Sequence, residues 1–355
     1  MDLRHAGELR SKMKQYIPRI AAIATLLVTT NAVQAASNTS LPDVVPPGTV
    51  LVVGGPTVQT AFRLSGELQK LPFKVVFTTF SGGPAVLDAF RAKALDIGSG
   101  NDIPAIHETF LGFDIRIIAV ARRRNLPNPV QFGIAPGANI KSLVDLRGKK
   151  IAYSAGQAQG SVVLRTLKRY GIKKSEVQLV PLPSRTDVYV NALVSHLVDA
   201  APLGNTVFSK HFIDNYGKDG AKLLAPDGVT ENPINLWVRA ETLQDPAKAA
   251  AIKYYLKAYI RAQHWVDRHH EDWIRNYYIK DQGLSRADAE YLVHSGGEIE
   301  ILSNWDQSIR DEQDTVNFMA TETGQKPFDA RRIFDRRFEA VAAKTVQDIK
   351  IAEKN

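Results

Sequence analysis

Residues 77–94, which read FTTFSGGPAVLDAFRAKA, decide the fold of this chain. A run rich in β-branched and aromatic residues, Lys74 to Phe80, predicts a strand, and apolar residues that recur every four positions predict a helix over Ala85 to Ala94. The small residues at 81–84 join the strand to the helix. A strand that leads into a helix through such a corner is typical of α/β proteins.

The same order recurs along the chain. Further short runs rich in β-branched residues lie at Val50–Val53, Ile115–Val120, Val130–Ile134, Ile151–Tyr153 and Val177–Val180. Because helical patterns separate several of these runs, we expect two lobes, each a mixed, mainly parallel sheet flanked by helices.

The last third of the chain has a different pattern. Asp245-Pro246 opens a helical stretch that is expected to run to about Lys280, since proline suits a first helical turn. More helix is expected from Ser285 to the end. We interpret residues 245–355 as helices that cover one lobe.

The first 35 residues have the pattern of a secretory signal peptide. Five basic residues precede an apolar stretch from Ile20 to about Thr30, and Val33-Gln34-Ala35 follows with small residues at positions −3 and −1. The apolar stretch is about half of the ~20 residues that a membrane-spanning helix needs. We therefore predict cleavage after Ala35, with a retained membrane anchor as the alternative.

The composition excludes several classes of site. The chain has no cysteine, which rules out a disulfide framework, a thiolate metal site, a cysteine nucleophile and a lipid-bearing cysteine. Cleavage would lower the net charge from +8 to +5, because residues 1–35 carry five basic and two acidic residues. The basic residues are spread along the chain without a recognised module, so nucleic acid is not expected as a partner. About 320 residues would remain, a length at which one core usually divides into two lobes.

Two further corners repeat the shape of the first. Residues 154–161, SAGQAQGS, lie between a predicted strand and a helix from Val162 to Tyr170. Residues 95–104, LDIGSGNDIP, lie where another strand would lead into the next helix. A P-loop ends in Gly-Lys-Ser/Thr, and residues 160–162 lack that lysine, so nucleotide hydrolysis is not expected.

Helix starts at such corners can bind an anion. The first N–H groups of a helix have no internal partner and together carry about half a positive charge. In open α/β sheets, ligands bind at the carboxyl ends of the strands. Ordinary turns also use Gly and Ser, but three such corners together predict a site for a weakly hydrated monoanion, because no countercharge accompanies them.

At these corners the chain resembles the periplasmic binding proteins of ABC importers for aliphatic sulfonates, taurine and nitrate. The motifs that carry the likeness are SGGP at 81–84, LDAF at 87–90, ALDIGSGNDIP at 94–104, KSLVDLRGKKIA at 141–152 and LVDA at 197–200. The resemblance covers roughly residues 48–260 and is strongest from 75 to 170.

The resemblance implies a type II binding protein with a ligand cleft between two lobes and with no catalytic residue, cofactor or metal. Its expected parts are a signal peptide at 1–35, an extended leader at 36–47, lobe I at 48–125 and 228–355, and lobe II at 126–227. Such a protein is a periplasmic monomer that captures a sulfonate or sulfate ester by hinge closure and then docks an inner-membrane ABC permease.

The expected ligand-binding residues lie at the three corners and on neighbouring loops. They are Thr57, Gln59, Ser81, Gly82, Gly83, Asn101, Asp102, Gln157, Gln159, Gly160, Ser161, Arg185, Gly204, Asn205 and Trp237. A plain turn is the alternative for residues 57–59, an exposed helix-start arginine for Arg185, and core packing for Trp237. The family usually has a Trp-Asp-Pro-type corner where this chain reads APLGNT at 201–206, so the organic tail of the ligand stays open.

Other interpretations remain at this stage. An enzyme of the same fold, such as the pyrimidine-precursor synthase relatives, would need a His or Lys aimed into the cleft, and the three corners contain no credible base. A sensor would use the same closure as an importer. Nitrate, bicarbonate and a neutral pyrimidine or vitamin precursor are alternative ligands. Arg122–Arg124 is interpreted as a solvated charge run, and His264, His269 and His270 do not share a helix face as metal ligands would.

Overall fold

The computed structural model describes residues 40–80, 83–126, 129–229 and 233–354. The predicted signal peptide and two expected ligand-binding residues, Ser81 and Gly82, lie outside this range and stay predictions. Ser40–Asn355 forms one compact unit. In the described residues, no helix combines the length and apolarity needed to cross a bilayer.

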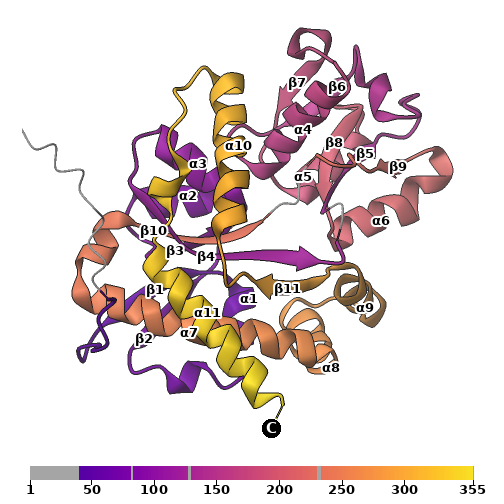
Figure 1. Ribbon diagram of the computed structural model, residues 1–355. Helices are drawn as coiled ribbons and strands as arrows, with labels where there is room; N and C mark the ends of the chain where they lie inside the picture. Colours follow the sequence, from indigo (N-terminus) through magenta and orange to yellow (C-terminus); the bar gives the residue numbers. More distant parts are fainter. Residues whose placement is uncertain (1–39, 81–82, 127–128, 230–232, 355) are drawn as a thin grey trace, which may run out of the picture. The chain divides into compact units, whose positions relative to one another are not determined.

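The first of two sheets has the strand order β11-β4-β10-β3-β1-β2 (Figure 1). Its strands are β1 (Val50–Gly54), β2 (Lys74–Thr78), β3 (Ile97–Gly100), β4 (Ile115–Arg124), β10 (Ile234–Arg239) and β11 (Glu298–Ile301). β1 runs parallel to β2 and β3, whereas β10 runs antiparallel to β3 and β4.

The second sheet is built from the middle of the chain, in the order β7-β6-β8-β5-β9. Its strands are β5 (Val130–Ile134), β6 (Lys150–Tyr153), β7 (Gln178–Pro181), β8 (Ala200–Gly204) and β9 (Lys222–Leu224). β6 runs parallel to β7 and β8, and β5 runs antiparallel to both of its neighbours.

The mixed two-sheet α/β fold expected from the sequence is confirmed. Parallel pairings do not outnumber antiparallel ones among the described strands, because β5 and β10 each oppose both of their neighbours. A central antiparallel strand in an otherwise parallel arrangement leaves no mark in the hydrophobic pattern, since strands buried on both faces look alike in either direction.

Six helices each begin shortly after the carboxyl end of a strand. They are α1 (Pro56–Leu64), α2 (Gly83–Arg91), α3 (Asp102–Phe110), α4 (Ala158–Arg169), α5 (Thr186–Val194) and α6 (Val207–Tyr216). The strand and the helix predicted on either side of residues 81–82 are therefore confirmed, and the order of strand and helix recurs in both sheets.

The C-terminal part is mostly helical, as expected, with two differences. Its helices are α7 (Pro246–Arg268), α8 (His270–Trp273), a π-helix (Ile274–Asp281), α9 (Arg286–Ser295), α10 (Asp306–Thr323) and α11 (Arg336–Ala352). The stretch expected to run unbroken to Lys280 is interrupted at His269, whose backbone is not helical. The expectation of helix from Ser285 to the end is wrong at Glu298–Ile301, which forms β11.

The strand β11 is held in place by charge. Glu298 lies opposite Arg124 and Glu300 opposite Arg122 in the ladder with β4, with ion-pair distances of 2.6 and 2.7 Å. Opposite charges across a ladder stabilise the pairing of two strands. The arginine run, interpreted from sequence as a solvated charge run, is therefore half of a cross-strand ladder.

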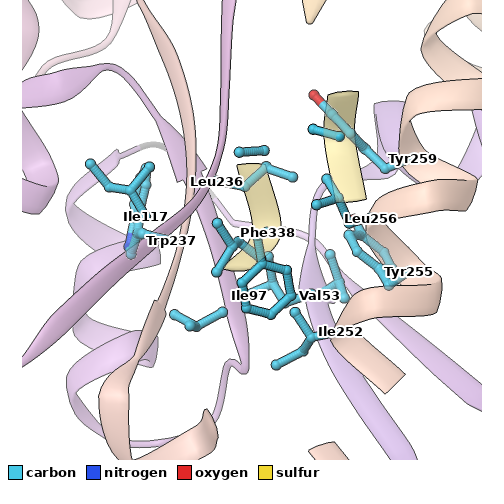
Figure 2. Packing of buried hydrophobic residues seen from close by; sticks show 14 of the residues in the cluster. Val53, Ile97, Ile117, Leu236, Trp237, Ile252, Tyr255, Leu256, Tyr259 and Phe338 are labelled. Carbon is cyan, nitrogen blue, oxygen red and sulfur yellow. The ribbon is translucent and has the colours of Figure 1, made fainter. Parts of the chain in front are cut away.

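The main core lies between the first sheet and the helices α7 and α11. Figure 2 shows Ile252, Tyr255 and Leu256 of α7 beside Val53 and Phe338. A separate apolar cluster joins α3, α4 and α10 through residues that include Ile106, Leu164 and Val316. Helix α10 thus contacts helices of both sheets, so the C-terminal helices do not cover one lobe alone.

Trp237 belongs to the main core. Its side chain is 1% exposed (Figure 2). A Cβ on either Gly98 or Gly100 of the neighbouring strand would overlap its ring. The glycines are needed because a side chain at either position would occupy the space of the indole ring. The expectation that Trp237 contacts a ligand is corrected to the alternative, core packing.

Candidate functional site

The start of α2, which follows a strand of the first sheet, contacts the start of α4, which follows a strand of the second sheet. Gly83 is the first residue of α2, and a Cβ there would overlap the Oε1 atom of Gln157, the residue before α4. Gln157 is buried at 7% exposure. One residue earlier, Gly156 has a φ of +68° and lies against His107 of α3. The structure therefore brings the first and second glycine-rich corners together.

At the starts of α1 and α4, no side chain of the preceding residue accepts a hydrogen bond from the first N–H groups. The residues before α1 and α4, Gly55 and Gln157, make no side-chain cap, and neither helix has an acidic residue in its first turn. Four N–H groups at a helix start lack an internal partner and attract negative charge. The first residue of α1 is Pro56, which has no N–H group, so the start of α1 offers fewer donors than the start of α4. Both starts still have free N–H groups that can bind an anion.

The third corner already holds a carboxyl group of its own. The Asp102 carboxylate, at the start of α3, accepts a hydrogen bond from the N–H of Ile103 at 2.9 Å and one from the Thr315 hydroxyl at 3.2 Å. Burial raises the pKa of Asp102, and the charge of Arg165 opposes that shift. Asn101 donates to the carbonyl of Pro233 at 3.5 Å. Contrary to expectation, this corner is not free for an anionic head group.

A cavity of about 350 Å³ lies between the start of α1 and the carboxyl end of β8. We call it the aromatic cavity, and its lining includes Thr57, Arg123, Gly204, Asn205, Asp267, His270, Trp273 and Tyr278. Three expected residues, at 57, 204 and 205, thus share one cavity with an arginine and two aromatic side chains.

Hydrogen bonds fix the polar wall of the aromatic cavity. The Thr57 and Tyr277 hydroxyls are 2.6 Å apart. The Asn205 amide donates to the Ser295 carbonyl at 2.6 Å and accepts from the Tyr291 hydroxyl at 3.2 Å. Asn205 therefore connects the second sheet to α9, and its amide is largely occupied by the protein.

Two side chains of opposite charge, Arg123 and Asp267, line the aromatic cavity. Arg123 donates to the Gly296 carbonyl at 2.9 Å, which orients the guanidinium without neutralising it. Burial raises the pKa of Asp267 to about 6. A neutral Asp267 leaves the cavity with a net positive wall, whereas an ionised one offsets Arg123.

The remaining expected residues are in three situations. Gln59 lines a separate hollow with Arg63 and Asp281, away from the aromatic cavity. Gln159 accepts from the Ser184 hydroxyl at 2.7 Å, and Arg185 is paired with Asp187 at 2.6 Å, as its alternative interpretation expected.

Gly160 and Ser161 lie inside the second corner. A Cβ on Gly160 would overlap the carbonyl oxygen of Ser154, so only glycine fits there. Ser161 is 5% exposed and lies 3.4 Å from the Nε atom of Arg165 on the same helix. Both residues therefore pack inside the first turn of α4.

Sequence reasoning missed Arg123, Asp267, Trp273 and Tyr278. The two aromatic residues cannot be told from packing residues in the sequence, because nothing in a helical pattern tells which face of the helix returns to a strand end far away in the chain. The alternation of Glu298-Ile299-Glu300-Ile301 is the one signal that could have indicated β11 and, with it, the position of Arg123.

Comparisons with known proteins agree with this geometry. A family model described as NMT1/THI5 like matches residues 92–269, which is half of the chain. A curated relative, the putative aliphatic sulfonates-binding protein of Escherichia coli (strain K12), is 30% identical over 115 residues. That alignment spans 32% of this chain and only 35% of the relative's length.

Solved structures match over a longer range. The alkanesulfonate-binding protein SsuA from Xanthomonas axonopodis pv. citri, bound to MOPS, aligns with a TM-score of 0.66 and 19% identity, over 86% of this chain and 99% of that chain. The periplasmic aliphatic sulphonate binding protein SsuA from Escherichia coli aligns with a TM-score of 0.65 and 20% identity, over 81% and 92%. This likeness establishes the periplasmic binding protein fold, and the resemblance read from the corners is confirmed.

Proposed function

The chain belongs to the NMT1/THI5-like family, and on that premise we propose that it is the periplasmic solute-binding component of an ABC importer. Its ligand is a sulfonate or a sulfate ester held between the two sheets. The names of its relatives, which are binding proteins for sulfonates, support this ligand class.

One observation carries the ligand assignment. The helices α1 and α4 begin between the two sheets without a side-chain cap and without an acidic first turn. A sulfonate has three acceptor oxygens and a single, weakly hydrated charge, which suits backbone N–H donors without a lysine or metal. A phosphate-sized dianion would need more countercharge than these corners supply.

The aromatic cavity supports a ligand with a bulky organic part. Trp273 and Tyr278 offer apolar and π surface next to Thr57 of α1, and Arg123 offers a cation. Apolar walls with a few oriented polar groups are typical of small-molecule sites. We therefore place the organic tail in the aromatic cavity, which Thr57 of α1 lines, and the oxyanion at the uncapped helix starts.

Capture proceeds by closure of one lobe on the other. Lobe I comprises residues 48–125 and 228–355, and lobe II comprises residues 126–227. Closure excludes water, which strengthens the contacts between N–H donors and the anion. The closed form is then the one that an inner-membrane permease recognises, because the ligand stabilises that state over the open one.

Binding without turnover is part of the proposal. His107 lies against Gly156 at the second corner, so a basic residue does approach it. Glu108 follows His107, with 3.6 Å between the Nδ1 atom and the carboxylate. We assign His107 to packing between the two sheets, and ligand recovered unchanged after long incubation, as measured by mass spectrometry, is the expected result.

Isothermal titration with a ligand panel tests the function. The panel contains taurine, alkyl sulfonates, aryl sulfonates, sulfate esters and nitrate, and we expect stoichiometric binding of one sulfur oxyanion. Binding of a neutral vitamin precursor with no heat from any sulfur compound would refute the ligand class. Chemical conversion of the bound compound would instead favour the same-fold enzyme.

A further inference from the structure

A second cavity, of about 770 Å³, lies among α3, α4, α10 and β10. It shares no lining residue with the aromatic cavity. We call it the acidic cavity, because its lining contains the carboxylates of Asp102, Asp311, Glu312 and Asp314. The proposed sulfonate site makes no use of it.

Two buried side chains of the acidic cavity have polar atoms without a partner. Asn235 of β10 is 1% exposed, and within the described residues neither atom of its amide meets the geometry of a hydrogen bond, although the amide lies close enough to Glu312 to lower the pKa of that carboxyl group. Glu312 of α10 is 3% exposed, and its Oε1 atom likewise has no hydrogen-bond partner in the part of the chain that the structure describes. Because an unpaired polar group away from water costs free energy, their presence together on one cavity wall indicates a ligand that supplies the missing partner.

The charged side chains of the acidic cavity determine the sign of the charge that its ligand would carry. Four acidic side chains line it against two basic ones, Arg122 and Arg165. Arg122 is paired with Glu300 at 2.7 Å. Arg165 donates to the Thr315 hydroxyl at 2.9 Å and stacks on Phe318. Arg122 is therefore neutralised by Glu300, whereas the hydrogen bond of Arg165 to a hydroxyl leaves its charge in place. The four carboxyl groups outnumber this one unpaired arginine, so the cavity favours a cation.

The groups without a partner indicate which kind of cation would bind. Within the described residues, no group of three or more His, Cys, Asp or Glu side chains could hold a metal ion. One carboxylate oxygen and one amide oxygen with no partner are instead acceptors for the N–H groups of an ammonium ion. The volume leaves room for an organic chain attached to it.

We propose that the acidic cavity binds the ammonium group of an organic amine, with Glu312 and Asn235 as hydrogen-bond acceptors. The site is separate from the sulfonate site and does not depend on it. Asp102 contributes negative charge from α3, and Asp311 and Asp314 attract the cation at the solvent-facing side.

Amine binding should release a proton from Glu312, which can be measured. Burial raises the pKa of Glu312 well above its usual range, and the nearby charge of Asp102 raises it further. The charged groups that line the cavity with Glu312 are Asp102, Arg122, Arg165, Asp311 and Asp314. An arriving ammonium ion stabilises the carboxylate, so Glu312 loses its proton on binding and the amine binds more tightly as the pH rises.

Calorimetry with simple amines tests the site on the whole protein. The probes are n-butylamine and 1,4-diaminobutane, with n-butanol as a neutral match and tetramethylammonium as a cation without N–H donors. We expect one amine site, with heats that vary with the ionisation enthalpy of the buffer, and no binding of butanol or tetramethylammonium. If neither amine binds the wild-type protein at about millimolar affinity or better, the proposal is wrong.

Two variants locate the site. Glu312→Gln removes the charge and keeps the shape, so we expect at least a tenfold loss of amine affinity and no buffer-dependent proton release. Asp219→Asn removes the same charge from an exposed position in a short 3-10 helix and should leave amine binding unchanged. Retained sulfonate binding checks that both variants fold. Equal amine affinity in Glu312→Gln and the wild type would overturn the assignment even if amines bind.

Discussion

The helices of this protein begin in two ways. At the outer helices α7, α9 and α11, the side chains of Asp245, Ser285 and Asp335 accept hydrogen bonds from the first N–H groups. Between the sheets, α1 and α4 begin without such a cap. A side-chain cap is worth about 1 kcal/mol of stability, so an uncapped start forgoes stability at a place where a ligand can supply the acceptor.

The largest effect should come from giving α4 a cap of its own. Gln157 has an extended backbone, φ −123° and ψ 154°, which suits aspartate before a helix. In Gln157→Asp the carboxylate would occupy the free N–H groups and repel an anion, so we expect sulfonate affinity to fall by roughly ten- to a hundredfold, or about 1.4–2.7 kcal/mol. Isothermal titration measures the change.

Gln157→Asn is the matched control for this variant. Asparagine caps a helix as well as aspartate but carries no charge, so it should weaken sulfonate binding less. Unchanged affinity in both variants would show that the start of α4 does not contact the anion. A loss of equal size in both would assign the effect to lost packing against Gly83.

The converse change removes a cap from an outer helix. Asp245→Ala takes away the acceptor for the N–H of Ala247, at 2.8 Å, and should lower the free energy of unfolding by about 1 kcal/mol. Denaturant unfolding measures this loss. Sulfonate affinity should not change, and a parallel loss of affinity would break the distinction between the two kinds of helix start.

Asp267 should make the sulfonate site sensitive to pH. Its pKa of about 6 means that the carboxyl ionises between pH 5 and 7, and the new charge opposes an anion, so we expect affinity to fall several-fold over that range. Titrations at pH 5 and pH 7 measure the change. Asp267→Asn should flatten it, and His270→Asn controls for the histidine that lines the same cavity.

The same carboxyl affects stability, with a sign that follows from its raised pKa. The unfolded value lies near 4, so the folded chain holds the proton more tightly between about pH 4 and 6. The free energy of unfolding should therefore fall as the pH rises through 6. Asp267→Asn should remove that part of the pH dependence, and a variant with the wild-type profile would contradict the assigned pKa.

The smallest effect is expected at the β4–β11 ladder. Glu300→Ala removes an exposed ion pair with Arg122, so the free energy of unfolding should change by no more than about 1 kcal/mol. Sulfonate affinity should be unchanged, since only Arg123, between the two paired arginines, lines the aromatic cavity. A strong loss of affinity would mean that the ladder positions Arg123.

The sequence predicts local features of this fold better than distant contacts. The corners at 81–84 and 154–161 could be predicted because glycines, strand patterns and helix patterns are all local. Trp237 could not be assigned to the core, because its burial depends on Gly98 and Gly100 in a strand that joins it only through the sheet. Asp102 was predicted as a ligand contact, yet it fills its own helix start, which only the contact with Thr315 of α10 makes evident.

A crystal structure of the protein with a bound sulfonate tests most directly whether uncapped helix starts hold the anion. We expect sulfonate oxygens within hydrogen-bond distance of the first backbone N–H groups of α1 or α4, with the organic part beside Trp273. A sulfonate held by side chains alone, with those N–H groups bonded to the protein or to water, would contradict it.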